Sequence, residues 1–226
     1  MRQLPLGVRL QDRALFESFL PGANGQALAA AQALAGARDS LLYLHGIEAS
    51  GKSHLLQAMC AACAGAAYLP LRTLRALAPE ALEGLAGLPL VAIDDPEAIA
   101  GEMPWEQRLF SLYNECLAAG TRIAVAARTP AVDLPLALPD LRSRLAAMPH
   151  FALRPLDEAQ QRSALQARAA ARGIHLPEDA VHYLQRRFAR DMASLSEILE
   201  RLDAASLEAK RPLTLPFIRS VLGDAS

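Results

Sequence analysis

The sequence has almost no net charge. Its 23 Lys and Arg residues are balanced by 24 Asp and Glu residues, for a formal net charge of −1. A chain without an overall positive charge lacks the general electrostatic signal of a nucleic-acid-binding protein. We therefore expect any contact with DNA to be local, or to be supplied by a partner.

Long apolar runs are also lacking. The most apolar stretch, residues 55–71, is interrupted by Gln57, Gly65 and Pro70, which predicts that no helix spans a membrane. The N-terminus shows neither a long apolar run nor a cleavage signature, so we expect no secretory signal. These absences favour a cytoplasmic protein without a membrane partner.

Cysteine is scarce, with only Cys60, Cys63 and Cys116. An odd, small number of cysteines is typical of a reducing compartment. Cys60 and Cys63 have the C-x-x-C spacing of a redox pair or of half a zinc site. However, the sequence has no second pair and no histidine nearby at ligand spacing. We therefore predict that they are two small core residues on a helix.

Alternating strand and helix patterns fill the first two thirds of the chain. This alternation predicts an α/β fold with a five-stranded, mainly parallel sheet that is covered on both faces. The predicted strands are residues 40–46, 66–71, 88–95, 121–127 and 150–155, and the main helices are residues 52–64, 105–120 and 138–148. After Pro155 the strand signals stop and a small all-helical unit follows, in which Pro177 fits the first position of a helix.

One segment has the pattern of a phosphate-binding loop. GIEASGKS, residues 46–53, fits G-x-x-x-x-G-K-[ST] between a predicted strand and a predicted helix. In such a loop the backbone N–H groups surround a phosphate, while Lys52 reaches the β- and γ-phosphates and Ser53 holds magnesium. The glycines let the backbone turn and approach closely. The candidate nucleotide-binding residues are Gly46, Ser50, Gly51, Lys52, Ser53 and His54.

Two carboxylates end the predicted strand VAIDD. Asp94 is placed to hold the magnesium, directly or through water, and Asp95 to orient or activate a water molecule. A pair of acids at this place can also simply cap the next segment. The phosphate loop upstream favours the functional interpretation.

The order of these parts resembles the AAA+ ATPases, within them the replication-initiator branch, and most closely the Hda family of regulators that inactivate the initiator DnaA. The resemblance covers nearly the whole chain. It implies a nucleotide-binding AAA+ domain over residues 11–155, a helical lid over residues 156–226, and bound ADP or ATP with Mg²⁺. It is carried by residues 16–24 (FESFLPGAN), 43–56 (YLHGIEASGKSHLL), 99–114 (IAGEMPWEQRLFSLYN), 138–145 (LPDLRSRL) and 213–222 (LTLPFIRSVL).

The resemblance also assigns a role to Arg144. It matches the arginine that AAA+ proteins present to a neighbour's nucleotide, where it stabilises charge on the γ-phosphate during hydrolysis. Arg142 lies two positions away and cannot share that direction on a helix. Without the resemblance, an exposed helix charge would be the simpler interpretation of Arg144.

The N-terminal tail, residues 1–10, acquires a role in the same way. Gln3, Leu4 and Leu6 match the Q-L-x-L segment with which Hda-like proteins bind the replication sliding clamp, the β subunit of DNA polymerase III. An extended peptide of this kind places alternate side chains in apolar pockets, and Pro5 reduces the entropy lost on docking. Gly7 stands where many such segments have an aromatic residue, so we expect weak binding. The partners implied are DnaA and the clamp, with DNA contacted mainly through the clamp, and self-association stays open.

Two family positions differ. The lid arginine that would reach the nucleotide is replaced by Ala193, and Arg190 is nearly a full turn away. The polar sensor at the end of the fourth strand is replaced by alanines, Ala126 and Ala127, with Arg128 or Thr129 as substitutes. Both differences predict weak or no intrinsic ATPase activity.

Three functions follow for testing. The first is a clamp-bound regulator that uses Arg144 to stimulate hydrolysis of DnaA-bound ATP. The second is a remodelling ATPase of the helicase-loader or clamp-loader type, which acts by its own hydrolysis. The third, a small-molecule kinase, is disfavoured by the long helical unit. We expect no origin-recognising initiator, since no basic helix-turn-helix follows the lid. The first function agrees best with the residues.

Overall fold

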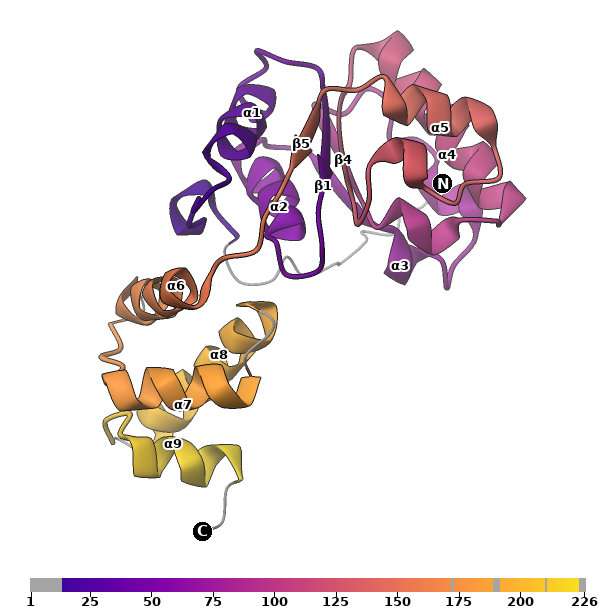
Figure 1. Ribbon diagram of the computed structural model, residues 1–226. Coiled ribbons are helices and arrows are strands. Elements are labelled where there is room, and N and C mark those ends of the chain that lie inside the picture. The colour runs from indigo at the N-terminus through magenta and orange to yellow at the C-terminus, as the bar shows by residue number, and fades with distance from the viewer. Residues whose placement is uncertain (1–13, 172, 189–191, 210, 224–226) are drawn as a thin grey trace. The chain divides into compact units, whose positions relative to one another are not determined.

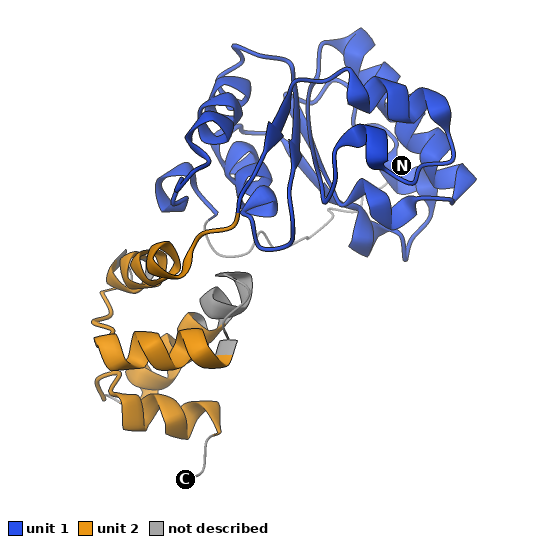
Figure 2. Cartoon of the chain, in the orientation of Figure 1, with its two compact units in different colours: residues 1–154 blue, residues 155–226 orange. Residues whose placement is uncertain are grey.

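The structure, a computed structural model, describes residues 14–171, 173–188, 192–209 and 211–223. The chain divides into two compact units, residues 1–154 and residues 155–226 (Figure 2).

The first unit is built on a five-stranded sheet with the strand order β2-β3-β4-β1-β5 (Figure 1). All four strand pairings are parallel, which confirms the predicted sheet. Each strand is shorter than its predicted range, because the flanking residues form turns rather than ladder hydrogen bonds. The strands are β1 (Leu41–His45), β2 (Ala67–Pro70), β3 (Leu90–Asp94), β4 (Arg122–Ala127) and β5 (His150–Ala152).

Helices cover both faces of this sheet (Figure 1). Side chains alternate across the pleat, so that Leu42 and Leu44 pack with α1 (Gly25–Ala35) and α2 (Lys52–Ala62). Tyr43 packs on the opposite face, with α4 (Met103–Ala119) and α5 (Pro139–Ala146). A short helix, α3 (Leu71–Leu74), follows β2, and 3₁₀ turns occupy Phe16–Ser18, Pro79–Leu82, Pro96–Ile99 and Ala131–Asp133.

The helices of this unit largely follow the sequence prediction. Helix α4 ends at Gly120, whose φ of 72° is the left-handed conformation that suits a glycine cap. Helix α1 was not predicted, because alanine occupies so many of its positions that no apolar face stands out. Cys60 and Cys63 pack in the core beside α2, as predicted, although Cys63 lies just past the end of the helix. Burial raises the pKa of the Cys60 thiol to about 12.

Arg122 ties both α1 and α2 to the sheet from the amino end of β4. Its Nη1 atom donates to the carbonyl oxygens of Leu34 and Ala35, both at 2.7 Å, at the C-terminal end of α1. Its Nε atom donates to Pro89 O at 2.7 Å, and Nη2 lies 3.1 Å from the sulfur of Cys63. A cation placed at helix C-termini also complements their dipoles.

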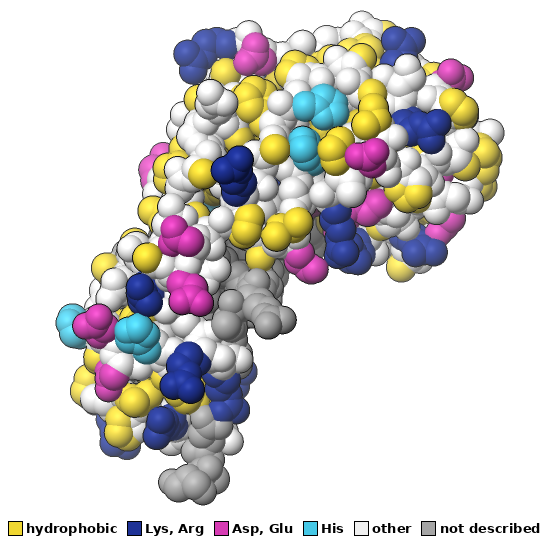
Figure 3. Space-filling model, viewed as in Figure 1, with side chains coloured by type: hydrophobic (Ala, Val, Ile, Leu, Met, Phe, Trp, Pro, Cys, Tyr) yellow, Lys and Arg dark blue, Asp and Glu magenta, His cyan; other side chains and the backbone are white. Residues whose placement is uncertain are grey.

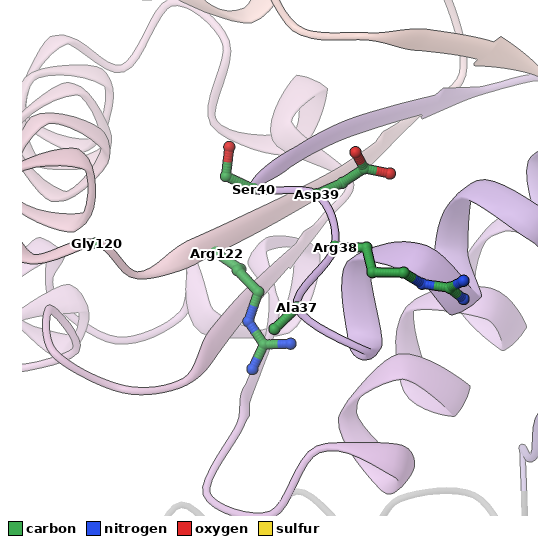
Figure 4. A pocket seen from close by; sticks show the side chains of 6 residues that line it. All are labelled: Ala37, Arg38, Asp39, Ser40, Gly120 and Arg122. Carbon is green, nitrogen blue, oxygen red and sulfur yellow. The ribbon is translucent and has the colours of Figure 1, made fainter.

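A hollow of about 420 Å³ lies beside this guanidinium (Figure 4). Because the guanidinium donors are already bonded to carbonyl oxygens and to a sulfur, Arg122 has a structural role there. The hollow is lined by Ala37, Arg38, Asp39, Ser40, Gly120 and Arg122, at the edge of the sheet opposite to the phosphate loop.

The second unit consists of four helices around a core of its own. They are α6 (Glu158–Ala171), α7 (Glu178–Phe188), α8 (Met192–Ala209) and α9 (Leu215–Leu222). The prediction for Pro177 was wrong by one position. Helix α7 begins at Glu178, and the Pro177 carbonyl accepts the Val181 N–H at 3.0 Å from just outside the helix. Among the described residues, we find no helix long and apolar enough to cross a bilayer.

Candidate functional site

The segment Gly46–Ser53 connects the end of β1 to the start of α2, in the strand–loop–helix context that the sequence predicted. The N–H of Gly46 donates to Ala127 O at 3.2 Å, which ties the start of the loop to the end of β4. Helix α2 begins at Lys52, so its first backbone N–H groups face the loop without intrahelical partners. This arrangement provides an anion-binding site.

Two glycines of the loop have no room for a side chain. Gly51 has a φ of 96°, and a Cβ atom there would lie 2.8 Å from Cε2 of Phe19. A Cβ atom on Gly46 would collide with the carbonyl oxygen of Leu153. The loop is therefore packed closely between the residue after β5 and an aromatic ring from the segment before α1.

Lys52 lies inside the loop. Its side chain is buried, with 7% of the residue exposed, and Nζ donates to Gly46 O at 2.7 Å and to Ile47 O at 2.9 Å. Burial lowers the pKa of Lys52, and the nearby carboxylates, Asp94 first among them, act in the opposite direction. The loop thus holds one ammonium group at its centre, where a bound phosphate would need a counter-charge.

Asp94, at the end of β3, has the features of a cation ligand. It is 3% exposed, and its Oδ2 atom accepts the Tyr68 hydroxyl at 2.7 Å. Its Oδ1 atom is buried and has no hydrogen-bond partner among the described residues. Burial raises the pKa of this carboxyl, whereas the hydroxyls of Ser53 and Tyr68 lower it. A buried carboxylate oxygen is costly without a partner, and a carboxylate beside a serine hydroxyl fits magnesium.

Asp95 is placed differently. Its backbone is left-handed, with a φ of 55°, and its N–H donates to Ala126 O at 3.0 Å. Its carboxylate accepts Nε of Arg72, in α3, at 2.9 Å. Asp95 therefore already has a cationic partner, unlike Oδ1 of Asp94. Its role in orienting water stays a prediction.

Three residues near the loop were missed by the sequence reasoning or left as mere alternatives. Tyr68 was assigned only to a strand, and nothing in its sequence context indicates that it bonds Asp94. Glu97 accepts the backbone N–H of Arg128 at 3.1 Å through Oε1, while its Oε2 atom is buried and unpartnered within the described part of the chain. Burial raises the pKa of Glu97.

His54 lies in the first turn of α2, but its ring is engaged elsewhere. Nε2 lies 3.0 Å from Leu15 O and 3.3 Å from Ser18 Oγ, and the ring stands 5.5 Å from that of Phe19. The side chain thus fastens the segment before α1 to α2. Any contact of His54 with nucleotide would come from its backbone N–H.

Arg144 is exposed on α5. Within the described ranges its guanidinium makes neither a hydrogen bond nor an ion pair, and its charge lowers the pKa of Tyr113 in α4 against the larger effect of burial. Arg142, by contrast, reaches Leu136 O at 3.4 Å through Nη1. Arg144 is therefore the better placed of the two to contact another molecule.

Other predicted positions fall at the margins of the described structure. Gln3, Leu4 and Leu6 lie outside the described residues, as does Arg190. Ala193 falls in the first turn of α8. Ala126 and Ala127 are buried at the end of β4, where their carbonyl oxygens accept the N–H groups of Asp95 and Gly46.

Solved structures with the same fold include replication initiators and a branch-migration motor. Domain III of DnaA from Thermotoga maritima matches with a TM-score of 0.75 and 20% identity, over 94% of this chain and 96% of that one. AMPPCP-bound DnaA from Aquifex aeolicus matches with a TM-score of 0.69 and 17% identity, over 88% and 68%. The Thermotoga maritima RuvB Holliday junction branch migration motor matches with a TM-score of 0.61 and 14% identity, over 87% and 66%.

The fold and the phosphate loop together define an AAA+ type protein: a five-stranded parallel α/β unit followed by a helical lid, in the arrangement of the DnaA-related branch. The lid is more specific. Residues 157–222 match the family model for the Hda lid domain. The chain therefore has an Hda-type lid on a DnaA-like AAA+ fold, and the resemblance drawn from its sequence is confirmed at this level.

Proposed function

We propose that this chain is a nucleotide-bound negative regulator of replication initiation, which stimulates the hydrolysis of ATP bound to a DnaA-type initiator. The observation that carries the proposal is the Hda-type lid at residues 157–222 on a DnaA-like fold. The exposed guanidinium of Arg144 on α5 supports it, because an arginine that acts on another molecule's nucleotide must be accessible.

We infer that the loop Gly46–Ser53 holds ADP or ATP with Mg²⁺. The buried ammonium of Lys52 would neutralise the phosphates, and the N–H groups at the start of α2 would bind them. The unpartnered Oδ1 atom of Asp94 and the Ser53 hydroxyl would hold the magnesium ion. The bound nucleotide then serves to fix the conformation of this chain, whereas the hydrolysed ATP belongs to the partner.

Arg144 supplies the chemistry that the partner's site lacks. A guanidinium placed beside a γ-phosphate stabilises the charge that develops on its oxygens in the transition state, and such an arginine contributes about 10³–10⁵ in rate. The partner keeps the attacking water and the rest of its own site. This chain adds one positive charge at the reacting phosphate.

The sliding clamp, the β subunit of DNA polymerase III, would bring the two proteins together on DNA. In this proposal Gln3, Leu4 and Leu6 bind the clamp as an extended peptide. DNA is then contacted mainly through the clamp, which agrees with a net charge of −1.

The test is turnover of ATP pre-bound to the cognate initiator, with this protein added in the presence and absence of clamp loaded on DNA. We expect hydrolysis to require both the protein and the loaded clamp. Arg144→Ala should lower the stimulated rate by about a thousandfold and leave nucleotide binding and melting temperature unchanged. Gln3→Ala combined with Leu6→Ala should abolish only the dependence on the clamp.

Arg142→Ala is the matched control, since it removes an arginine two positions away on the same helix. It should retain most of the stimulation. Persistent stimulation by the Arg144→Ala protein would contradict the assignment of the finger. No stimulation by the wild-type protein, together with vigorous hydrolysis by this chain alone, would favour a remodelling ATPase of the helicase-loader or clamp-loader type.

A further inference from the structure

Beyond Lys52, a second cation stands beside the phosphate loop. Arg128 follows the last residue of β4, the strand that lies between β1 and β3 in the sheet. The two residues before it bond to both motifs of the site: Ala127 O accepts the N–H of Gly46, and Ala126 O accepts the N–H of Asp95. Arg128 is therefore fixed at the junction of the phosphate loop and the acidic strand end.

The backbone of Arg128 is held firmly, but its guanidinium is not. Its N–H donates to Oε1 of Glu97 at 3.1 Å. Its Nε atom lies 3.7 Å from that same oxygen, and its Nη2 atom lies 3.7 Å from Oε2 of Glu48. A well-formed charged pair is about 2.7–2.9 Å long, and the pair between Arg72 and Asp95 reaches 2.9 Å. The guanidinium of Arg128 is thus only loosely held between two carboxylates.

The two carboxylates come from the elements that enclose a nucleotide in loops of this kind. Glu48 belongs to the phosphate loop itself and is 80% exposed, whereas Glu97 follows β3 and is 16% exposed. Exposed pairs contribute little stability, so a phosphate group, with more charge and more acceptor oxygens, can replace them as the partner of Arg128. Its charge already reaches Lys52, whose pKa it lowers in addition to the larger effect of burial.

We propose that Arg128, held between Glu48 and Glu97, determines how strongly this chain distinguishes a nucleoside triphosphate from a diphosphate. Without a terminal phosphate, the guanidinium stays with the two carboxylates. A terminal phosphate draws it away, and the same two carboxylates oppose that exchange. The discrimination is therefore set by the balance of one cation against two acids. The proposal rests on the nucleotide site proposed above and adds the residues that set its selectivity.

The test compares the affinities of AMPPCP and ADP, each with Mg²⁺, by equilibrium titration of the full chain. Arg128→Gln should weaken AMPPCP binding by about tenfold or more, as expected for loss of a hydrogen bond to a charged group, and should change ADP binding much less. Glu48→Gln should act in the opposite direction. It should strengthen AMPPCP relative to ADP by roughly two- to fivefold, the range for an exposed pair.

Arg38→Gln is the matched control, because it removes an exposed arginine at the opposite edge of the sheet. It should leave both affinities unchanged. If Arg128→Gln weakens both nucleotides equally or neither of them, while the wild-type chain binds both, the assignment of Arg128 is wrong and the nucleotide site stands. If the wild-type chain binds neither nucleotide, the proposed site itself is wrong, and the role of Arg128 is wrong with it. Because Glu48 is exposed, its variant keeps the test valid even if another variant folds poorly.

Discussion

At the scale of single residues, the site combines groups that a motif reveals with groups that only the fold brings together. Gly46, Lys52 and Asp94 could be found from the sequence, because each belongs to a short contiguous pattern with a known chemistry. Tyr68 could not, since it is separated from Asp94 by 26 positions and reaches it only because β2 pairs with β3. The same holds for Glu97 and its bond to Arg128, across 31 positions.

The bond between Tyr68 and Asp94 gives a prediction about pH. Burial raises the pKa of Asp94, and the Tyr68 hydroxyl opposes this by donating to the ionised carboxylate. Removing the hydroxyl therefore raises that pKa further. Because a protonated Asp94 cannot hold magnesium, we expect Mg²⁺-dependent nucleotide binding by Tyr68→Phe to be lost at a higher pH than in the wild type, on lowering the pH from 8.

The measurement is nucleotide affinity against pH, with and without Mg²⁺. Tyr113→Phe is the control, because it removes a tyrosine hydroxyl on the other face of the sheet, near Arg144. Its profile should coincide with that of the wild type. Identical profiles for Tyr68→Phe and the wild type would show that Asp94 does not govern the magnesium dependence.

The same shift has a consequence for folding. The pKa of Asp94 in the folded chain lies above its unfolded value, so the folded state binds more protons between the two values. Asp94 therefore lowers the free energy of unfolding as the pH rises through this interval. A residue retained at that cost is consistent with a role in binding a cation.

At the scale of elements, the position of α5 depends on one buried acid in α4. Glu106 is 0% exposed. Its Oε1 atom accepts the N–H groups of Gly101 at 2.6 Å and Ala137 at 3.0 Å, and its Oε2 atom accepts that of Leu138 at 2.7 Å. Leu138 is the residue from which α5 starts. The carboxylate therefore fixes the beginning of the helix that presents Arg144.

We predict that Glu106→Gln destabilises the first unit by about 2–4 kcal/mol. Glutamine has a single acceptor oxygen, so its amide group would face a backbone N–H and leave that donor buried and unpaired. Denaturant unfolding measures the loss of stability, and amide hydrogen exchange at Ala137 and Leu138 localises it. The start of α5 should lose protection first.

Glu115→Gln on the same helix is the matched control. Glu115 pairs with Arg108 at 2.8 Å but is exposed, with 45% of its side chain accessible. Its loss should cost at most about 1 kcal/mol. An equally small effect for Glu106→Gln would mean that α5 is held by its apolar contacts alone.

The helices also show how far a sequence pattern reaches. Helix α4 was predicted within two residues of its observed start because its apolar side chains repeat with helical spacing and Gly120 ends it. Helix α1 was missed because its alanines blur that spacing. It is positioned partly by Arg122, which comes from a strand 87 positions further along the chain. Such a contact leaves no local trace.

At the scale of the whole molecule, the chain contains separate cores. Two of them cover the two faces of the sheet in residues 1–154, and a third lies within the helices of residues 155–226. The predicted change from α/β to all-helical structure near Pro155 reflects this division, since strand signals end there. A sequence pattern can show a change of class, but it does not show whether the two units unfold together.

We predict that the two units unfold independently. Leu199 is fully buried in the core of the helical unit, and Leu56 is fully buried between α2 and the sheet. Leu199→Ala should destabilise the helical unit by about 2–5 kcal/mol, the usual cost of such a cavity, and amide exchange should rise in α6–α9 while β1–β5 stay protected. Leu56→Ala should give the reverse pattern and serves as the reciprocal control. If either variant exposes the amides of both units to the same extent, the chain unfolds as one cooperative unit, and the lid is then bound energetically to the nucleotide-binding unit.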